Sequence, residues 1–288
     1  MQLKKIYKRS FLLPAVILYT VLFVVPCIMG IAYSFTNWNS MSQNIKFIGL
    51  QNYVDIFTSN NSYVLSIKNT LIFTVFASFL KIVISLAFAL FLNRSFKTQS
   101  LLRGIYFMPF AISSLIIGII FTSVLAPDGI FNSFLRVIGL GSLATSWLSN
   151  IKTALWSTIA VEIWRSIGLN MVIFLAGLQM IDKTYYEAAD IDGANKWKSF
   201  LNITIPFLIP SVAINLVLNI IHGLKVFDII VALTNGGPGS ATQVINTNVF
   251  KTYSMGAYGL STALSTVIFI LTTIIAMMTF KLIAPKEA

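Results

Sequence analysis

The sequence predicts an all-α membrane protein with six transmembrane helices, and three observations support this fold class. Of the 288 residues, 57% are hydrophobic and only 10% are charged, whereas soluble domains carry about 25% charged residues. The mean hydropathy is +0.84. The apolar residues gather in six long runs, and most charges lie in the short loops between them. So few charges cannot cover the surface of a water-soluble fold of this size.

The six apolar runs are each long enough to cross a bilayer, which takes roughly 20 residues of helix. They cover residues 11–35, 70–92, 104–126, 153–179, 206–233 and 259–283. The first run follows Lys4, Lys5, Lys8 and Arg9, as the apolar part of a signal peptide would. It is too long for a signal sequence, and no small-residue cleavage site follows it. We therefore expect a retained membrane anchor.

The distribution of Lys and Arg predicts the orientation. With the N-terminus in the cytoplasm, twelve of the 20 Lys and Arg residues fall in inner segments, five in outer loops and three within spans. Cytoplasmic loops carry the excess of these residues, so both termini are predicted to be cytoplasmic. The net charge of +11 then reflects membrane orientation rather than nucleic-acid binding.

One membrane domain is predicted for residues 11–283, with cytoplasmic ends at 1–10 and 284–288. The outer loop at 37–69 is long enough to form a small cap. Cys27 is the single cysteine, so no intrachain disulfide is expected. His222 is the single histidine, and a catalytic zinc ion needs about three protein ligands. We therefore expect no metal site.

The loop at about 182–206, between the fourth and fifth spans, predicts a short helix, a turn and a second helix. Glu187, Ala188 and Ala189 favour helix, and Gly193 permits a turn that other residues resist. Pro206 and Pro210 are expected in the first turn of the next span, where proline is tolerated.

The spacing within this loop resembles a known motif. Glu187-Ala188-Ala189 is followed after three residues by Gly193, and after nine more by Ile-x-Ile-Pro at 203–206. This resembles the EAA loop of permease subunits in binding-protein-dependent ABC importers. The family pattern ends in Ile-x-Leu-Pro, so Ile205 is a conservative departure.

Further segments resemble the carbohydrate-uptake class of these permeases, the MalF/MsmF-like subunits, along nearly the whole chain. They are residues 11–15, 34–38, 47–53, 69–70, 176–179, 227–228 and 233–238, followed by Thr242. Larger relatives carry extra N-terminal spans and a big outer domain, and this chain resembles the compact six-span form. The resemblance implies a multi-pass protein of a bacterial or archaeal cell membrane.

The resemblance also implies how transport is energised. The EAA loop would be a coupling helix that docks on a cytoplasmic ATPase dimer through Glu187, Ala188, Ala189, Asp192 and Gly193. That partner would bind ATP and Mg, and this chain would hold no cofactor. Its Gly-Gly-Pro-Gly at 236–239 lacks the following Lys-Ser or Lys-Thr of a P-loop. The other implied partners are a second permease, an extracytoplasmic solute-binding protein, membrane lipid and a sugar substrate.

Charged side chains within spans are functional candidates, because they are costly there. Glu162 and Arg165 lie three residues apart on one helical face, with Trp164 between them. They form either an internal ion pair that fixes helix packing or part of a sugar site. A sugar site needs carboxylates or amides for the hydroxyl groups and an aromatic ring for the apolar face of the sugar.

In sugar permeases the substrate lies near the midplane, between the third span and the two spans that flank the EAA loop. The resemblance therefore implies a pathway lined by Phe110, Ser114, Glu162, Trp164, Arg165, Leu169, Asn215, Asn219, Gly223 and Val226.

Three titratable residues outside this set have other interpretations. Lys81 is predicted to snorkel or to pair with a neighbouring subunit. Lys225 and Asp228, three residues apart, are predicted to form a local ion pair. For His222, one turn from Lys225, a proton relay is an alternative.

The leading functional hypothesis is a permease of an ATP-driven importer for a sugar, an oligosaccharide in particular. The same machine carrying glycerol 3-phosphate or another anionic solute is the alternative, because Arg165 suits an anion. An ion-coupled secondary transporter is more distant, since such proteins often show internal repeats and none is clear here. An enzyme would need a nucleophile–base or metal constellation. One histidine and few membrane carboxylates do not supply it.

Overall fold

The computed structural model describes residues 12–41, 44–58, 61–94 and 97–283. These residues are mainly helical, and a single isolated bridge pairs Thr36 with Phe47. The chain divides into two compact units, Met1–Asn61 with Asn248–Phe269 and Ser62–Thr247 with Ile270–Ala288. The predicted cytoplasmic ends at 1–10 and 284–288 lie outside the described residues.

Within the described residues, five helical segments are long and apolar enough to cross a membrane, and a bent helix pair makes a sixth. The first joins α1 (Leu13–Tyr19), a π-helical turn (Thr20–Val24) and α2 (Val25–Tyr33). The others include α4 (Asn61–Leu92), α8 (Ala154–Gln179) and α14 (Tyr258–Ile283). The predicted all-α membrane fold is therefore confirmed.

The first unit has its polar interior beside α3 (Gln51–Thr58). The buried Asn52 donates hydrogen bonds from Nδ2 to the carbonyl oxygens of Ser34 at 2.8 Å and Thr36 at 2.9 Å. The hydroxyls of Ser34 and Tyr53 are 2.6 Å apart. Helix α3 lies in the loop that was expected to form a small cap, and these bonds fix it to the end of the first span.

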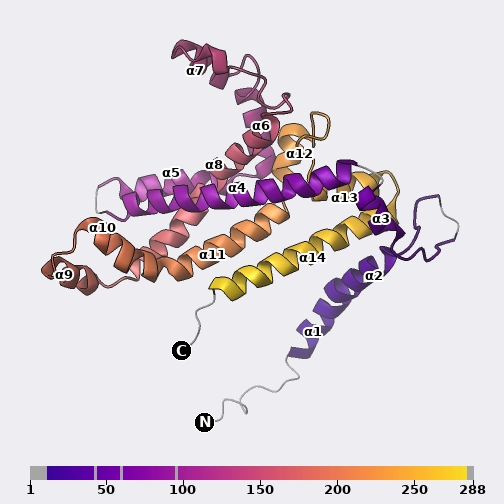
Figure 1. Ribbon diagram of the computed structural model, residues 1–288, viewed down its shortest axis with the longest axis horizontal. Coiled ribbons are helices and arrows are strands. Elements are labelled where there is room, and N and C mark those ends of the chain that lie inside the picture. Colours follow the sequence, from indigo (N-terminus) through magenta and orange to yellow (C-terminus); the bar gives the residue numbers. More distant parts are fainter. Residues whose placement is uncertain (1–11, 42–43, 59–60, 95–96, 284–288) are drawn as a thin grey trace, which may run out of the picture. The chain divides into compact units, whose positions relative to one another are not determined.

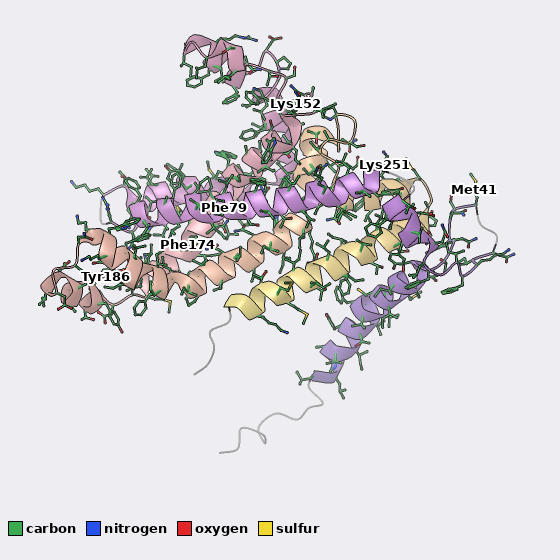
Figure 2. All side chains as sticks on the ribbon, in the orientation of Figure 1. Met41, Phe79, Lys152, Phe174, Tyr186 and Lys251 are labelled. Atoms are coloured by element: carbon green, nitrogen blue, oxygen red, sulfur yellow. The ribbon has the colours of Figure 1, made fainter. Side chains whose placement is uncertain are left out.

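In the second unit, α4, α5 (Gln99–Ala111), α8 and α11 (Ile205–Leu224) run side by side (Figure 1). Apolar residues of α4, α8 and α11 form one core cluster that includes Phe174 and Leu208, both fully buried. Side chains on the outer face of α4 are left for lipid, as Phe79 is 63% exposed while Phe174 lies between the helices (Figure 2). A second cluster links α4 and α8 with α6 (Ser114–Val124) and α12 (Asp228–Thr234).

Close crossings in this unit use glycine. A Cβ added at Gly168 of α8 would overlap the carbonyl oxygen of Tyr106 and lie 2.6 Å from Cα of Phe107, both in α5. Small residues let membrane helices approach closely enough for backbone contact. Helices α5 and α8 therefore meet at a point where no side chain fits.

The predicted third span at 104–126 is a bent pair of helices. Helices α5 and α6 meet at an angle of 97°, and Ile112 and Ser113 between them have extended backbone. Pro109 in the last turn of α5 weakens that helix, because its ring removes a hydrogen-bond donor. Hydropathy measures apolar length but carries no information about backbone direction.

The predicted fifth span at 206–233 starts within one residue of α11 but is wrong at its end. Helix α10 (Lys196–Ser199), a π-helical turn (Phe200–Thr204) and α11 form one helical segment that ends at Leu224. Helix α12 then starts separately at Asp228. Pro206 therefore lies inside a helical segment, directly after the π-helical turn, where a widened turn accommodates the missing donor of proline.

Candidate functional site

Glu162 of α8 is the centre of a buried charged cluster. Its Oε1 accepts hydrogen bonds from Lys81 Nζ of α4 at 2.8 Å and Ser166 Oγ at 2.7 Å. Arg165 donates from Nε to Oε2 at 3.0 Å and from Nη2 to Oε1 at 3.3 Å. Glu162, Lys81 and Arg165 are 0%, 1% and 7% exposed. One carboxylate thus joins two cations from two helices.

Glu162 and Arg165 form the ion pair that was one of their two alternatives, and the interpretation of Lys81 is corrected. Lys81 neither snorkels nor reaches a neighbouring subunit, because its ammonium group is bound to Glu162 within the chain. Pairing is the physical reason, since a buried cation without a counter-charge is costly. The bond also ties α4 to α8.

His222 of α11 closes the cluster on a third helix. Its Nε2 lies 3.4 Å from Arg165 Nη2, and its Nδ1 lies 3.5 Å from Glu162 Oε1. A guanidinium group only donates hydrogen bonds, so Nε2 acts as the acceptor and the ring proton is assigned to Nδ1, facing the carboxylate. The Arg165 guanidinium also lies over the Phe110 ring, 5.5 Å from its centroid.

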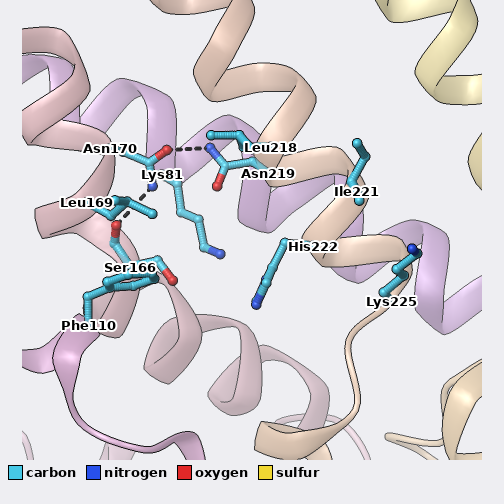
Figure 3. Close-up of a pocket in the computed structure, with 10 residues that line it drawn as sticks. All are labelled: Lys81, Phe110, Ser166, Leu169, Asn170, Leu218, Asn219, Ile221, His222 and Lys225. Carbon is cyan, nitrogen blue, oxygen red and sulfur yellow. Dashed lines mark hydrogen bonds between the residues drawn. The ribbon is translucent and has the colours of Figure 1, made fainter. Parts of the chain in front are cut away.

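A pocket of about 350 Å³ opens beside this cluster (Figure 3). Ten residues line it: Lys81, Phe110, Ser166, Leu169, Asn170, Leu218, Asn219, Ile221, His222 and Lys225. They come from α4, α5, α8 and α11 and from the C-cap of α11. The structure therefore brings Phe110, Leu169 and Asn219 of the predicted pathway to one cavity, with Glu162 and Arg165 directly behind it.

Asn170 was missed by the sequence interpretation, although it links the two helices beside the pocket. Its Oδ1 accepts a hydrogen bond from Asn219 Nδ2 at 2.7 Å, and its carbonyl oxygen accepts one from Asn215 Nδ2 at 3.4 Å. Ser166 was missed as well. Glu162, Ser166 and Asn170 lie four residues apart in succession, so they share one helical face, and that spacing would have indicated them.

Other residues of the predicted pathway lie away from this pocket. Trp164 packs against Phe121, with ring centroids 5.0 Å apart, and both border a second cavity near the start of α8. Val226 is buried in an apolar core cluster. Gly223 packs against Thr74 of α4, and Ser114 opens α6 beyond the bend.

The predicted pair of Lys225 and Asp228 is not formed. Among the ion pairs of the described residues, none joins these two side chains. Lys225 ends α11 and lines the pocket, whereas Asp228 begins α12. The chain leaves the helix between them, so the three-residue spacing no longer places them on one face.

The loop between α8 and α11 contains the predicted helix, glycine turn and second helix. Helix α9 (Lys183–Ile191) starts with Asp182 as its N-cap, whose Oδ1 accepts the Thr184 N–H at 2.9 Å. This bond lowers the pKa of Asp182 below its usual value. Gly193 has φ +75° after the helix, and Asn195 caps α10 by accepting the Lys198 N–H at 2.8 Å.

Helix α9 is anchored on one side and exposed on the other. The hydroxyl of Tyr186 lies 2.9 Å from Oγ1 of Thr204 in the π-helical turn below α11. Glu187, Ala188, Asp192 and Gly193 are exposed, and Ala189 is half-buried. Ile191 is 87% exposed, and Met180 and Trp197 are also exposed. Large apolar side chains left open on a polar loop are typical of a protein–protein interface.

No metal centre emerges from the part of the chain that the structure describes, since it holds no group of three or more His, Cys, Asp and Glu side chains placed to bind an ion. The lining of the pocket supplies cations, amides and a hydroxyl group.

Spans that line a pocket, with an exposed helical loop joining two of the pocket helices, are the architecture expected of a membrane transport component. The family described as binding-protein-dependent transport system inner membrane component matches residues 81–287. The chain belongs to this family, and it is a transmembrane permease of that class.

Similar proteins match this chain over nearly its whole length. The multiple sugar-binding transport system permease protein MsmF of Streptococcus mutans serotype c is 32% identical, over 97% of this chain and 96% of the relative. A bacterial ABC transporter involved in the import of the acidic polysaccharide alginate matches with a TM-score of 0.83 and 25% identity, over 97% of this chain and 95% of its own. A bacterial alginate ABC transporter in complex with an alginate pentasaccharide-bound periplasmic protein matches with a TM-score of 0.80 and 25% identity, and the match covers 94% of this chain and 91% of the transporter chain.

Proposed function

We propose that this chain forms part of the membrane pathway of an ATP-driven importer that takes up a saccharide, an oligosaccharide in particular. The observation that carries the proposal is the pocket between α4, α5, α8 and α11. It offers amide and hydroxyl groups from Asn170, Asn219 and Ser166 together with the ring of Phe110. Sugar-permease relatives of similar length support the choice of solute.

The proposed coupling follows from the chain connection between loop and pocket. Helices α8 and α11 both line the pocket, and α9 and α10 join them. Asn170 lies nine residues before the end of α8 at Gln179, which is about 14 Å at 1.5 Å per residue. A displacement of α9 by a docked ATPase would therefore be transmitted along two helices to the pocket walls.

We assign the docking surface to Glu187, Ala188, Ala189, Asp192 and Gly193. Glu187 is exposed and would pair with a basic group of the ATPase, while the exposed Ile191 would enter an apolar part of its cleft. ATP and Mg would be held by that ATPase dimer. A second permease would complete the pathway, and an extracytoplasmic binding protein would deliver the solute.

The test is uptake of labelled solutes by cells with and without this gene. The panel contains neutral mono- and oligosaccharides, uronate oligosaccharides and glycerol 3-phosphate. We expect selective loss of one saccharide when the gene is absent, and recovery when it is restored on a plasmid. Loss of glycerol 3-phosphate uptake alone would contradict the saccharide assignment, and uptake driven by an ion gradient without ATP would contradict the importer class.

A further inference from the structure

The titratable residues that line the pocket are all basic. They are Lys81, His222 and Lys225, and the other lining residues are uncharged. Glu162 does not line the pocket, and it is fully buried behind Lys81. Its oxygen atoms already accept hydrogen bonds from Lys81, Arg165 and Ser166. Glu162 therefore positions the cations and is not free to bind a solute hydroxyl group.

Positive charge exceeds negative charge around the pocket. Lys81 and Arg165 share the single carboxylate of Glu162, and Lys225 forms no ion pair among the described residues. The cations Lys81, Arg165 and Lys225 thus outnumber the carboxylate of Glu162, with His222 neutral in the assigned tautomer. Lys225 is exposed at the end of α11, so its ammonium group is accessible to an anionic group of the solute, and such a group would complete the pocket.

The remaining lining suits a saccharide. The Oδ1 atom of Asn219 accepts no hydrogen bond from the described residues, because only its Nδ2 is bound, to Asn170 (Figure 3). This oxygen is thus available to a hydroxyl group. The Phe110 ring borders the pocket, and an aromatic ring can cover the apolar face of a sugar.

We propose that the solute is an acidic oligosaccharide, whose carboxylate binds at Lys225 and Lys81 while its hydroxyl groups bind at Asn219 and Ser166. This inference rests on the proposed saccharide function and adds the charge of the solute to it. A carboxylate bound to an ammonium group forms a charge-assisted hydrogen bond. Replacing that carboxylate by an uncharged group would weaken productive binding about ten-fold, the size expected for one such bond.

The experiment compares uptake of uronate di- to pentasaccharides with uptake of the same compounds after reduction of each carboxylate to CH2OH. Intact cells carry the complete transporter with its binding protein unchanged, so any difference between strains arises in the permease. We expect Lys225→Gln to lower the ratio of acid to reduced uptake about ten-fold, and Lys225→Arg to keep the wild-type ratio. The matched control Lys152→Gln removes an exposed cation that does not line the pocket, and it should also keep that ratio.

Each outcome supports or overturns the inference. Equal uptake of acid and reduced compounds by the wild type overturns it while leaving the saccharide function standing. An unchanged ratio in Lys225→Gln, at an equal membrane level of the protein, overturns it as well. Entry of glycerol 3-phosphate without entry of any uronate would assign the anion to a phosphate group and refute the acidic saccharide. If the wild type imports no saccharide at all, the proposed function itself fails.

Discussion

Replacing Glu162 by Gln keeps the shape of the side chain and removes the charge that holds Lys81 and Arg165 together. The carboxylate is bound at 2.8 Å by Lys81 and at 3.0 and 3.3 Å by Arg165. Breaking a buried ion pair by removing one partner costs about 3–5 kcal/mol. At about 2–4 °C per kcal/mol for a chain of this size class, Glu162→Gln should lower the unfolding temperature by roughly 10 °C.

The assay is thermal unfolding of the purified protein in detergent, followed by tryptophan fluorescence. The control is Lys81→Met, which leaves Glu162 paired with Arg165 and should cost only about 1.5–3 kcal/mol. The double variant Lys81→Met/Glu162→Gln should be more stable than the sum of the two single effects, by about 1–3 kcal/mol. A Glu162→Gln protein that melts within about 1 °C of the wild type would refute the reasoning, because the calculated loss is many times larger.

Three further predictions concern the loop and one helix crossing. Glu187→Lys should reduce solute uptake at least about ten-fold, as expected when a paired charge is reversed, while an immunoblot shows a normal amount of the protein in the membrane. Glu187→Asp keeps the charge and should retain uptake. Normal uptake by the Lys variant would remove Glu187 from the docking surface. The pKa of Asp182 is lowered by the Thr184 N–H, so its capping bond stabilises α9 above the unfolded pKa of about 3.9 and is lost as the pH falls through the lower folded value. Hydrogen exchange of residues 183–191, corrected for intrinsic rates, should therefore rise at acid pH in the wild type and not in Asp182→Asn, and equal profiles would contradict this. Gly168→Val places carbon atoms against the α5 backbone and should destabilise the fold by at least about 1–3 kcal/mol, while an unchanged melting temperature would show that α5 moves freely.

Local signals in the sequence predicted local structure well. The order of helix, glycine turn and second helix in the 182–206 loop is confirmed, because Asp182, Gly193 and Asn195 act through bonds to residues within three positions. Apolar runs predicted the spans for a similar reason, since each helix satisfies its own backbone. The orientation and the roles of the EAA residues remain predictions.

Contacts distant in the sequence were not predictable in the same way. Lys81 and Glu162 are 81 positions apart, and no periodicity relates two residues on different helices. The direction of a side chain is equally hidden, because Trp164 borders the second cavity whereas the adjacent Arg165 lies over the Phe110 ring. Within one helix the spacing did indicate shared faces, both for Arg165 three residues after Glu162 and for Ser166 and Asn170 at successive intervals of four residues.

The extended backbone at Ile112 and Ser113 has a consequence for hydration. A helix that begins at Ser114 opens with N–H groups that have no partner within the helix, and lipid supplies none. Irregular backbone at membrane depth is stable only beside protein or a water-filled cavity. Phe110, two residues before the bend, lines the pocket. We therefore expect protein or water, rather than hydrocarbon, to cover the first turn of α6, so that its N–H groups are hydrogen-bonded even in the resting state.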